Sequence, residues 1–158
     1  MSKEKQYTRE EVKANRIIWA NFLMEPERKS VEGMLESPIN PGARCCLGHA
    51  CHIFIPHKRV VDEAGGISYG RAYSPTEWPP EQIEDMLGLW RNNAVTNTNY
   101  CGHSIKFPES FPDGAFNSLS EANDAGVSPQ EIGKYIMDNL EGGDETPFKP
   151  LSSYTSGE

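Results

Sequence analysis

The sequence predicts one α+β domain in which four or five short helices pack around a small antiparallel sheet. Three observations favour this fold class. Several segments open with helix-capping residues and continue with apolar residues at helical spacing. A glycine pair separates two short runs of β-branched and aromatic residues, as in a β-hairpin. The length of 158 residues suits a single hydrophobic core and is too short for two domains of ordinary size.

The first helix is predicted to begin after Thr8. Thr8 and Glu11 match a capping box, in which each side chain accepts a hydrogen bond from a backbone amide that the helix leaves free. The apolar residues that follow at helical spacing are Val12, Trp19, Phe22 and Leu23. Pro26 should end this helix, because proline lacks an amide hydrogen and clashes with the preceding turn.

The cysteine-rich segment RCCLGHACHIF, residues 44–54, is predicted to form the next helix. One stripe at helical spacing consists of Cys46, Leu47, Ala50, Cys51 and Phe54. Free cysteine is among the most buried residue types and packs as a small hydrophobe. We therefore predict that this stripe faces the core, with His49 and His52 beside it, toward the surface.

Two chemical alternatives for the cysteine-rich segment stay open. A zinc ion would need four ligands, which Cys46, His49, Cys101 and His103 could supply, although the close C-x-x-C spacing of structural zinc sites is absent. A catalytic thiol would need a base beside it, for which His49 or His103 is a candidate. The buried-core interpretation fits the spacing better, so no metal and no cofactor are expected.

A hairpin and another helix are predicted in the middle of the chain. Residues 60–73 carry β-branched and aromatic residues on both sides of Gly65-Gly66, a pair that tolerates the positive φ angles of tight turns. The sequence Pro79-Pro80-Glu81 is typical of a helix start, and Gly88 is a natural C-terminal cap.

Residues 91–117 are rich in Asn, Gly and Pro and predict a long irregular loop, with a short strand near Ile105–Phe107. Loops of this length are often functional. The aromatic residues that flank or lie in it are candidates for lining a small-ligand pocket: Trp78, Trp90, Tyr100 and Phe107.

Two short helices close the predicted domain. Ser118 and Ser128 each begin a capping-box pattern, and Gly142-Gly143 ends the second helix. The globular domain is therefore predicted to span residues 1–143, and residues 144–158 are predicted to be a flexible tail.

The net charge of −8, from 15 basic and 23 acidic residues, argues against binding to nucleic acid or to membrane surfaces. The two last helices have the spacing of a helix-turn-helix, but the second one is nearly neutral, whereas a DNA-reading helix is normally basic. No segment is long and apolar enough for a membrane span, and the N-terminus lacks the apolar core of a signal peptide. We therefore expect a cytoplasmic protein.

Three motifs occur in order: R-C-C-L-G-x-x-C at residues 44–51, P-P-E-x-x-x-x-x-L-G-L at residues 79–89, and L-x-x-x-N-D-x-G-x-S-x-x-E-I at residues 119–132. Together they resemble a family of small uncharacterised proteins encoded by tailed phages and prophages. The resemblance covers the chain from the first helix to about Leu140. It implies a phage accessory protein and supplies no catalytic residues, and positions 49 and 52 are not part of the family motif.

The resemblance, the acidic charge and the lack of a catalytic motif lead to a functional expectation. We expect a non-enzymatic protein that acts in the host cytoplasm by binding and inhibiting a host protein, such as a component of a defence system. One alternative is a protein that binds or sequesters a small nucleotide-type signal. Another is a thiol- or zinc-dependent activity at the Cys/His cluster.

We also predict a contact between two of the motifs. The cysteine-rich helix follows Pro41-Gly42 without Ser, Thr, Asn or Asp at its start, so its free amides need an acceptor from elsewhere. Asn123 and Asp124 are the candidates. We expect the Asp124 carboxylate to approach the amides or the guanidinium of the segment Arg44, Cys45 and Cys46.

Overall fold

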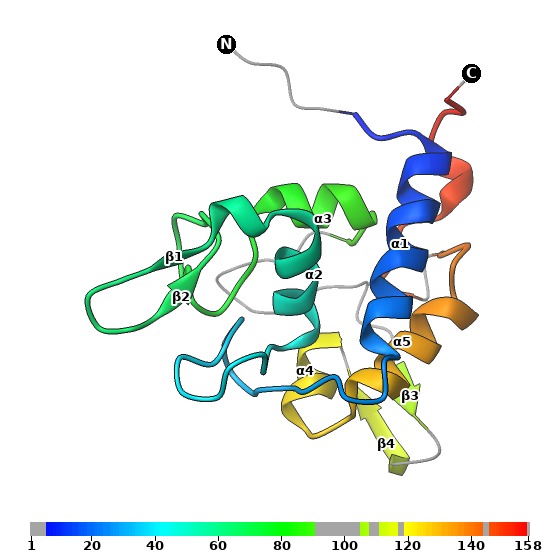
Figure 1. The fold of residues 1–158 in the computed structure, drawn as a ribbon. Helices are drawn as coiled ribbons and strands as arrows, with labels where there is room; N and C mark the ends of the chain where they lie inside the picture. The colour runs from blue at the N-terminus through cyan, green and yellow to red at the C-terminus, as the bar shows by residue number, and fades with distance from the viewer. Residues whose placement is uncertain (1–5, 91–104, 108–110, 117–118, 144–145, 158) are drawn as a thin grey trace.

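The computed structural model describes residues 6–90, 105–107, 111–116, 119–143 and 146–157. It confirms the α+β fold class (Figure 1). The helices among these residues are α1 (Arg9–Leu23), α2 (Cys46–Phe54), α3 (Glu81–Leu87), α4 (Leu119–Asp124), α5 (Pro129–Asp138) and the short 3-10 helices η1 (Pro56–Lys58) and η3 (Leu151–Ser153). The strands are β1 (Val60–Val61), β2 (Ile67–Ser68), β3 (Ile105–Phe107) and β4 (Phe111–Phe116). None of the described helices is both long and apolar enough to span a bilayer.

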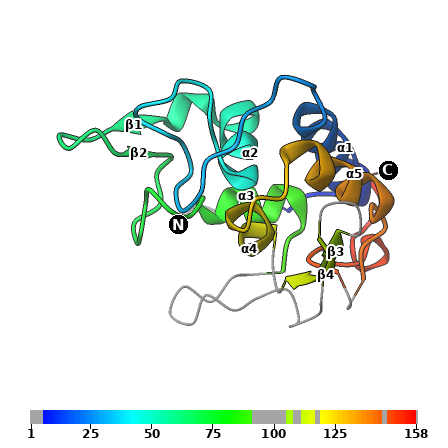
Figure 2. The same ribbon diagram turned by 90° about the horizontal axis from the view of Figure 1, so that it is seen from below.

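Helix α1 packs against α5, α3 and α2 (Figures 1 and 2). Its predicted capping box is present: the Glu11 amide donates to Thr8 Oγ1 at 3.2 Å, and the Thr8 amide donates to Glu11 Oε1 at 3.0 Å. Ser128 likewise caps α5, where its hydroxyl accepts from the Glu131 amide at 3.2 Å. Local capping chemistry therefore sets the start of both helices.

Arg16 is the buried charged residue of α1. Its guanidinium donates to the carbonyl oxygens of Leu87 at 2.8 Å, Leu140 at 2.7 Å and Lys149 at 2.8 Å. Burial lowers the pKa of Arg16 to about 10, so the group stays charged at neutral pH and depends on these acceptors. One side chain thus ties α1 to the end of α3, the end of α5 and the C-terminal segment.

Within the C-terminal segment, residues 146–157 pack against the core, so they do not form the flexible tail predicted for residues 144–158. Phe148 is fully buried and meets the Trp19 ring edge-on, with the ring centroids 6.4 Å apart. Leu151 is buried as well, and its carbonyl accepts a hydrogen bond from Arg9 at 3.2 Å. The segment has too few apolar residues for a periodic pattern, but these two fill space beside α1.

The strands form two-stranded antiparallel hairpins. In the first, Val60 pairs with Ser68 and Val61 with Ile67, which confirms the hairpin predicted around the glycine pair. In the second, β3 confirms the strand predicted near residues 105–107, and it pairs with β4. The β1–β2 hairpin projects from the side of α2 that faces away from α1 (Figures 1 and 2).

Candidate functional site

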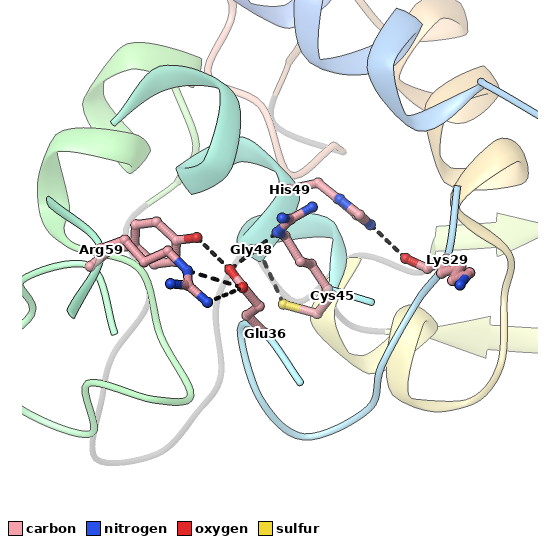
Figure 3. Close-up of polar contacts among 8 residues, drawn as sticks. Lys29, Glu36, Cys45, Gly48, His49 and Arg59 are labelled. Carbon is pink, nitrogen blue, oxygen red and sulfur yellow. Dashed lines mark hydrogen bonds and ion pairs between the residues drawn. The ribbon is translucent and has the colours of Figure 1, made fainter. Parts of the chain in front are cut away.

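Residues 24–45 form a long irregular loop between α1 and α2, which we call the braced loop because side chains from other elements hold its backbone. From α5, Gln130 donates to the carbonyl of Glu25 at 2.7 Å. From α2, the His49 Nε2 atom lies 2.7 Å from the carbonyl oxygen of Lys29 (Figure 3). Such contacts fix a segment that has no regular secondary structure of its own.

The N-D pair of the third motif also serves the braced loop. The Asn123 side chain donates to the carbonyl of Val31 at 2.8 Å, and the Gly33 amide donates to the Asp124 carboxylate at 2.9 Å. The predicted contact of Asp124 with residues 44–46 is therefore wrong: its hydrogen bond goes to the loop, and its charge acts on Cys45 only at longer range. The sequence could not show that Asn123 and Asp124 contact the loop, because these partners lie more than 90 positions apart in the chain.

A buried carboxylate, Glu36, closes the braced loop onto the hairpin (Figure 3). Its oxygens accept hydrogen bonds from Arg44 Nε at 3.1 Å, from Arg59 Nη2 at 2.8 Å and from the Tyr69 hydroxyl. Burial raises the pKa of Glu36, but the hydrogen bonds from Arg59, Tyr69 and Arg44 outweigh it, so the pKa lies below its usual range. Arg44 of the first motif therefore has a structural role, because it pairs with Glu36, a charged residue that is only 5% exposed.

The tip of the braced loop, residues 37–42, is a hydrogen-bonded turn. The Ser37 hydroxyl accepts from the amides of Ile39 at 3.2 Å and Asn40 at 2.9 Å. The Ser37 amide donates to the carbonyl of Ala43 at 2.9 Å, and the Ala43 amide donates to that of Asn40 at 3.1 Å. This turn presents the side chain of Ile39, which is 89% exposed.

Ile39 belongs to a group that we call the apolar surface, defined by Ile39, Val60, Val61 and Tyr73, all of them more than half exposed. The Glu36 contacts explain the grouping. Ile39 follows Glu36 by three positions, Val60 follows Arg59 directly, and Tyr73 follows Tyr69 by four. Chain length alone keeps each within about 15 Å of the Glu36 cluster. Four large apolar side chains near the Glu36 cluster therefore face solvent.

The cysteine-rich helix is buried, as predicted: Cys46 is 1% exposed and Cys51 0%. Helix α2 starts at Cys46, two residues later than expected, so Cys45 is its N-cap and its sulfur accepts from the Gly48 amide at 3.3 Å. The Cys46 thiol donates to the carbonyl of Leu119 at 3.8 Å. Burial raises the pKa of Cys45 to about 11 and that of Cys46 well above its usual value. A thiolate nucleophile is disfavoured at neutral pH.

His49 is fully buried, so its predicted position toward the surface is wrong. The ring packs against Phe22, with centroids 5.5 Å apart. Because its Nε2 faces the carbonyl oxygen of Lys29, that nitrogen carries the hydrogen. Burial lowers the pKa of His49 to about 4, which keeps the ring neutral. The side chain holds the loop and is not exposed to a substrate.

The zinc alternative gains no support from the described residues, which contain no group of three or more His, Cys, Asp or Glu side chains arranged to hold a metal ion. Cys46 and His49 are instead engaged with Leu119 and Lys29. Cys101 and His103 lie outside the described residues.

One of the predicted aromatic residues lines a pocket. Trp78 borders an open cavity of about 300 Å³. The residues around it that bear on its chemistry are Gly33, Cys45, Glu77, Trp78, Glu121 and Asp124. Trp90 lies elsewhere and donates to the carbonyl of Gly143 at 3.3 Å. Tyr100 and the side chain of Phe107 lie outside the described residues.

The loop character of residues 26–43 follows from the sequence, but the side-chain contacts that hold the braced loop and the Glu36 cluster do not, since they join residues far apart in the chain without any periodic pattern. One signal was present: Ile39 is a lone large apolar residue in the turn-forming sequence S-P-I-N-P-G. In the comparisons with known proteins, no family model, no curated protein and no solved structure matches this chain.

Proposed function

We propose that this chain is a phage accessory protein that acts in the host cytoplasm by binding and inhibiting a host protein, such as a component of a defence system. The observation that carries the proposal is Ile39, an 89% exposed apolar side chain on a turn with four internal hydrogen bonds. A preorganised turn loses little conformational entropy on binding. An exposed apolar side chain on such a turn, near further exposed apolar residues around the Glu36 cluster, has the character of a protein-docking site.

The other functional classes receive less support. The raised pKa values of the buried thiols disfavour Cys45 and Cys46 as catalytic nucleophiles. A nucleotide-type signal in the Trp78 pocket would place phosphates beside the carboxylates of Glu77, Glu121 and Asp124, which repel them. The net charge of −8 likewise disfavours nucleic acid. Protein binding through an apolar surface conflicts with none of these features.

The test is affinity capture from bacterial lysate with the wild-type chain and with the variant Ile39→Asp. The wild type is expected to retain a specific host protein that the variant loses, because a carboxylate cannot enter an apolar contact without a large desolvation cost. Mass spectrometry of proteins and of released small molecules covers both functional alternatives in one sample.

Ile18 provides the matched control, since it is a large apolar residue that is 50% exposed and lies on α1, away from the hairpin (Figure 1). Ile18→Asp should leave the capture unchanged. Retention of the same protein by Ile39→Asp, or its loss with Ile18→Asp instead, would contradict the proposed surface.

A further inference from the structure

Strand β1 has an unpaired edge, since its one neighbour among the described strands is β2. The Asp62 amide donates to the carbonyl of Gly66 at 2.9 Å. In an antiparallel ladder, hydrogen-bonded and non-hydrogen-bonded pairs alternate, so the next pair, Val61 with Ile67, is non-hydrogen-bonded. The backbone amide and carbonyl of Val61 therefore point away from β2, toward the open edge of the hairpin.

This edge faces solvent and its shape is held by the turn beside it. Every residue from 56 to 64 is exposed, and Val61 is 53% exposed. The Asp62 carboxylate accepts from the amides of Ala64 at 2.9 Å and Gly66 at 2.8 Å, which fixes the turn. The hairpin projects from the rest of the molecule (Figures 1 and 2). An exposed edge of this kind is a template for a further strand.

The sequence along this edge, RVVDE at residues 59–63, is complementary to itself. When two such strands run antiparallel with Val61 opposite Val61, Arg59 of each copy lies opposite Glu63 of the other. Opposite charges directly across a sheet stabilise the pairing. Arg59 has donors left for this contact, because it uses two N–H groups on Glu36, and its side chain stays 42% exposed.

The neighbouring registers fit less well. Every second residue points its backbone groups outward, so the pairing can shift only by two positions. A shift in one direction places Asp62 opposite Asp62, and like charges in this position are destabilising. A shift in the other direction pairs Lys58 with Asp62, whose carboxylate already serves the turn. The Lys58 ammonium also has a partner, the Gln82 side chain at 2.8 Å. Charge therefore favours the register centred on Val61.

We propose that a second copy of this chain docks on this edge, so that the two β1 strands pair antiparallel around Val61 and form one four-stranded sheet. The Val61 amide of each copy donates to the Val61 carbonyl of the other. The added strands stabilise a hairpin that would be marginal with two strands alone. The contact involves far fewer residues than the roughly 20–30 a side of a standard interface. We therefore expect a weak dimer, with a Kd on the order of 0.1 mM.

Sedimentation equilibrium of the full chain, from about 10 μM to about 1 mM, should show the mass rising from monomer toward dimer. Val61→Pro removes the outward-facing amide, at a position where an edge strand tolerates proline, and should weaken association by about tenfold or more. Glu63→Lys places a cation opposite Arg59 and should weaken it by about fivefold. Glu27→Lys, the same charge change at an exposed residue after α1, should associate like wild type.

Hydrogen exchange locates the contact without any substitution. The Val61 amide should exchange fast in dilute protein and more slowly as the concentration rises, whereas the Asp62 amide, which is bonded within the hairpin, is protected at both concentrations. A chain that stays monomeric at about 1 mM, or a dimer that either variant leaves intact, overturns the proposal. These measurements involve no host protein, so the Ile39→Asp capture stands or falls separately.

Discussion

In helix α2 and in the apolar surface, the burial of the side chains is the opposite of what their residue types suggest. The helix carries the cysteines and histidines that are typical of reactive sites, yet every residue from Cys46 to Cys51 is buried. The apolar surface has no reactive side chain, yet it exposes Ile39 to 89%. In the first region burial suppresses the chemistry of thiols and imidazole. In the second, side chains that ordinarily lie in a core face solvent. Exposure, and not residue type, therefore decides which of the two regions can contact another molecule.

Glu36 connects the two regions. It lies in the braced loop and contacts Arg44, two residues before α2, and Arg59, next to β1. Without the Glu36 carboxylate, each arginine would be an unpaired charge in a partly buried position, which destabilises the fold. The apolar surface is therefore held in place by contacts with the buried region around helix α2. Substitutions in each of the two regions can test this dependence.

The largest effect is expected for Gly48→Ala. A Cβ atom at Gly48 would lie 1.7 Å from the carbonyl oxygen of Leu35, a backbone atom that no rotamer change can move. Overpacking that side chains absorb costs about 1–3 kcal/mol. With a backbone obstacle we expect a loss of about 4 kcal/mol or more in the free energy of unfolding. Urea denaturation followed by circular dichroism measures it.

The control on the exposed side is Gly65→Ala. A Cβ atom there meets no atom within 4 Å, but the φ angle of +90° strains any other residue. The expected loss is about 1 kcal/mol, from backbone strain alone. If the two alanine variants lost equal stability, the close contact between α2 and the braced loop would not be a main support of the fold.

Gly48 is constrained by a contact with another segment, whereas Gly65 is constrained by its own backbone angle. The same distinction separates the parts of the structure that the sequence could not predict from those that it could. The capped starts of α1 and α5 and the β1–β2 hairpin depend on neighbours in sequence, so local patterns predicted them. Phe148 and His49 depend on partners far away in sequence, and their burial was missed. The cysteine stripe was assigned to the core from periodicity, but the role of Cys45 as a cap was missed because helix ends are uncertain by one or two residues.

A pH-dependent effect of intermediate size is expected from His49. Its folded-state pKa of about 4 lies below the usual 6.5, so the unfolded chain binds the proton more readily between these values. The contribution of His49 to the free energy of unfolding is therefore fully present above about pH 6.5. It is lost as the pH falls toward 4, by up to roughly 3 kcal/mol. Urea denaturation at intervals from pH 7 to 4 measures this loss.

The variant His49→Gln separates this contribution from those of other groups. Its amide can still donate toward the Lys29 carbonyl but does not titrate in this range. His52 and Glu36 are present in both proteins, so the difference between wild type and variant isolates position 49. Parallel stability curves for the two proteins would mean that His49 is not held neutral by burial.

The smallest effect in this series is expected at Cys45, where the buried helix meets the acidic pocket. Cys45→Ala removes the sulfur that accepts from the Gly48 amide and should cost about 1 kcal/mol, as loss of an N-cap does. Cys45→Ser keeps an acceptor at the same position, so its free energy of unfolding should stay within about 0.5 kcal/mol of wild type. Because serine is smaller than cysteine, an equal loss in both variants would indicate that the sulfur acts by packing. A larger loss in alanine alone would show that it acts as a cap.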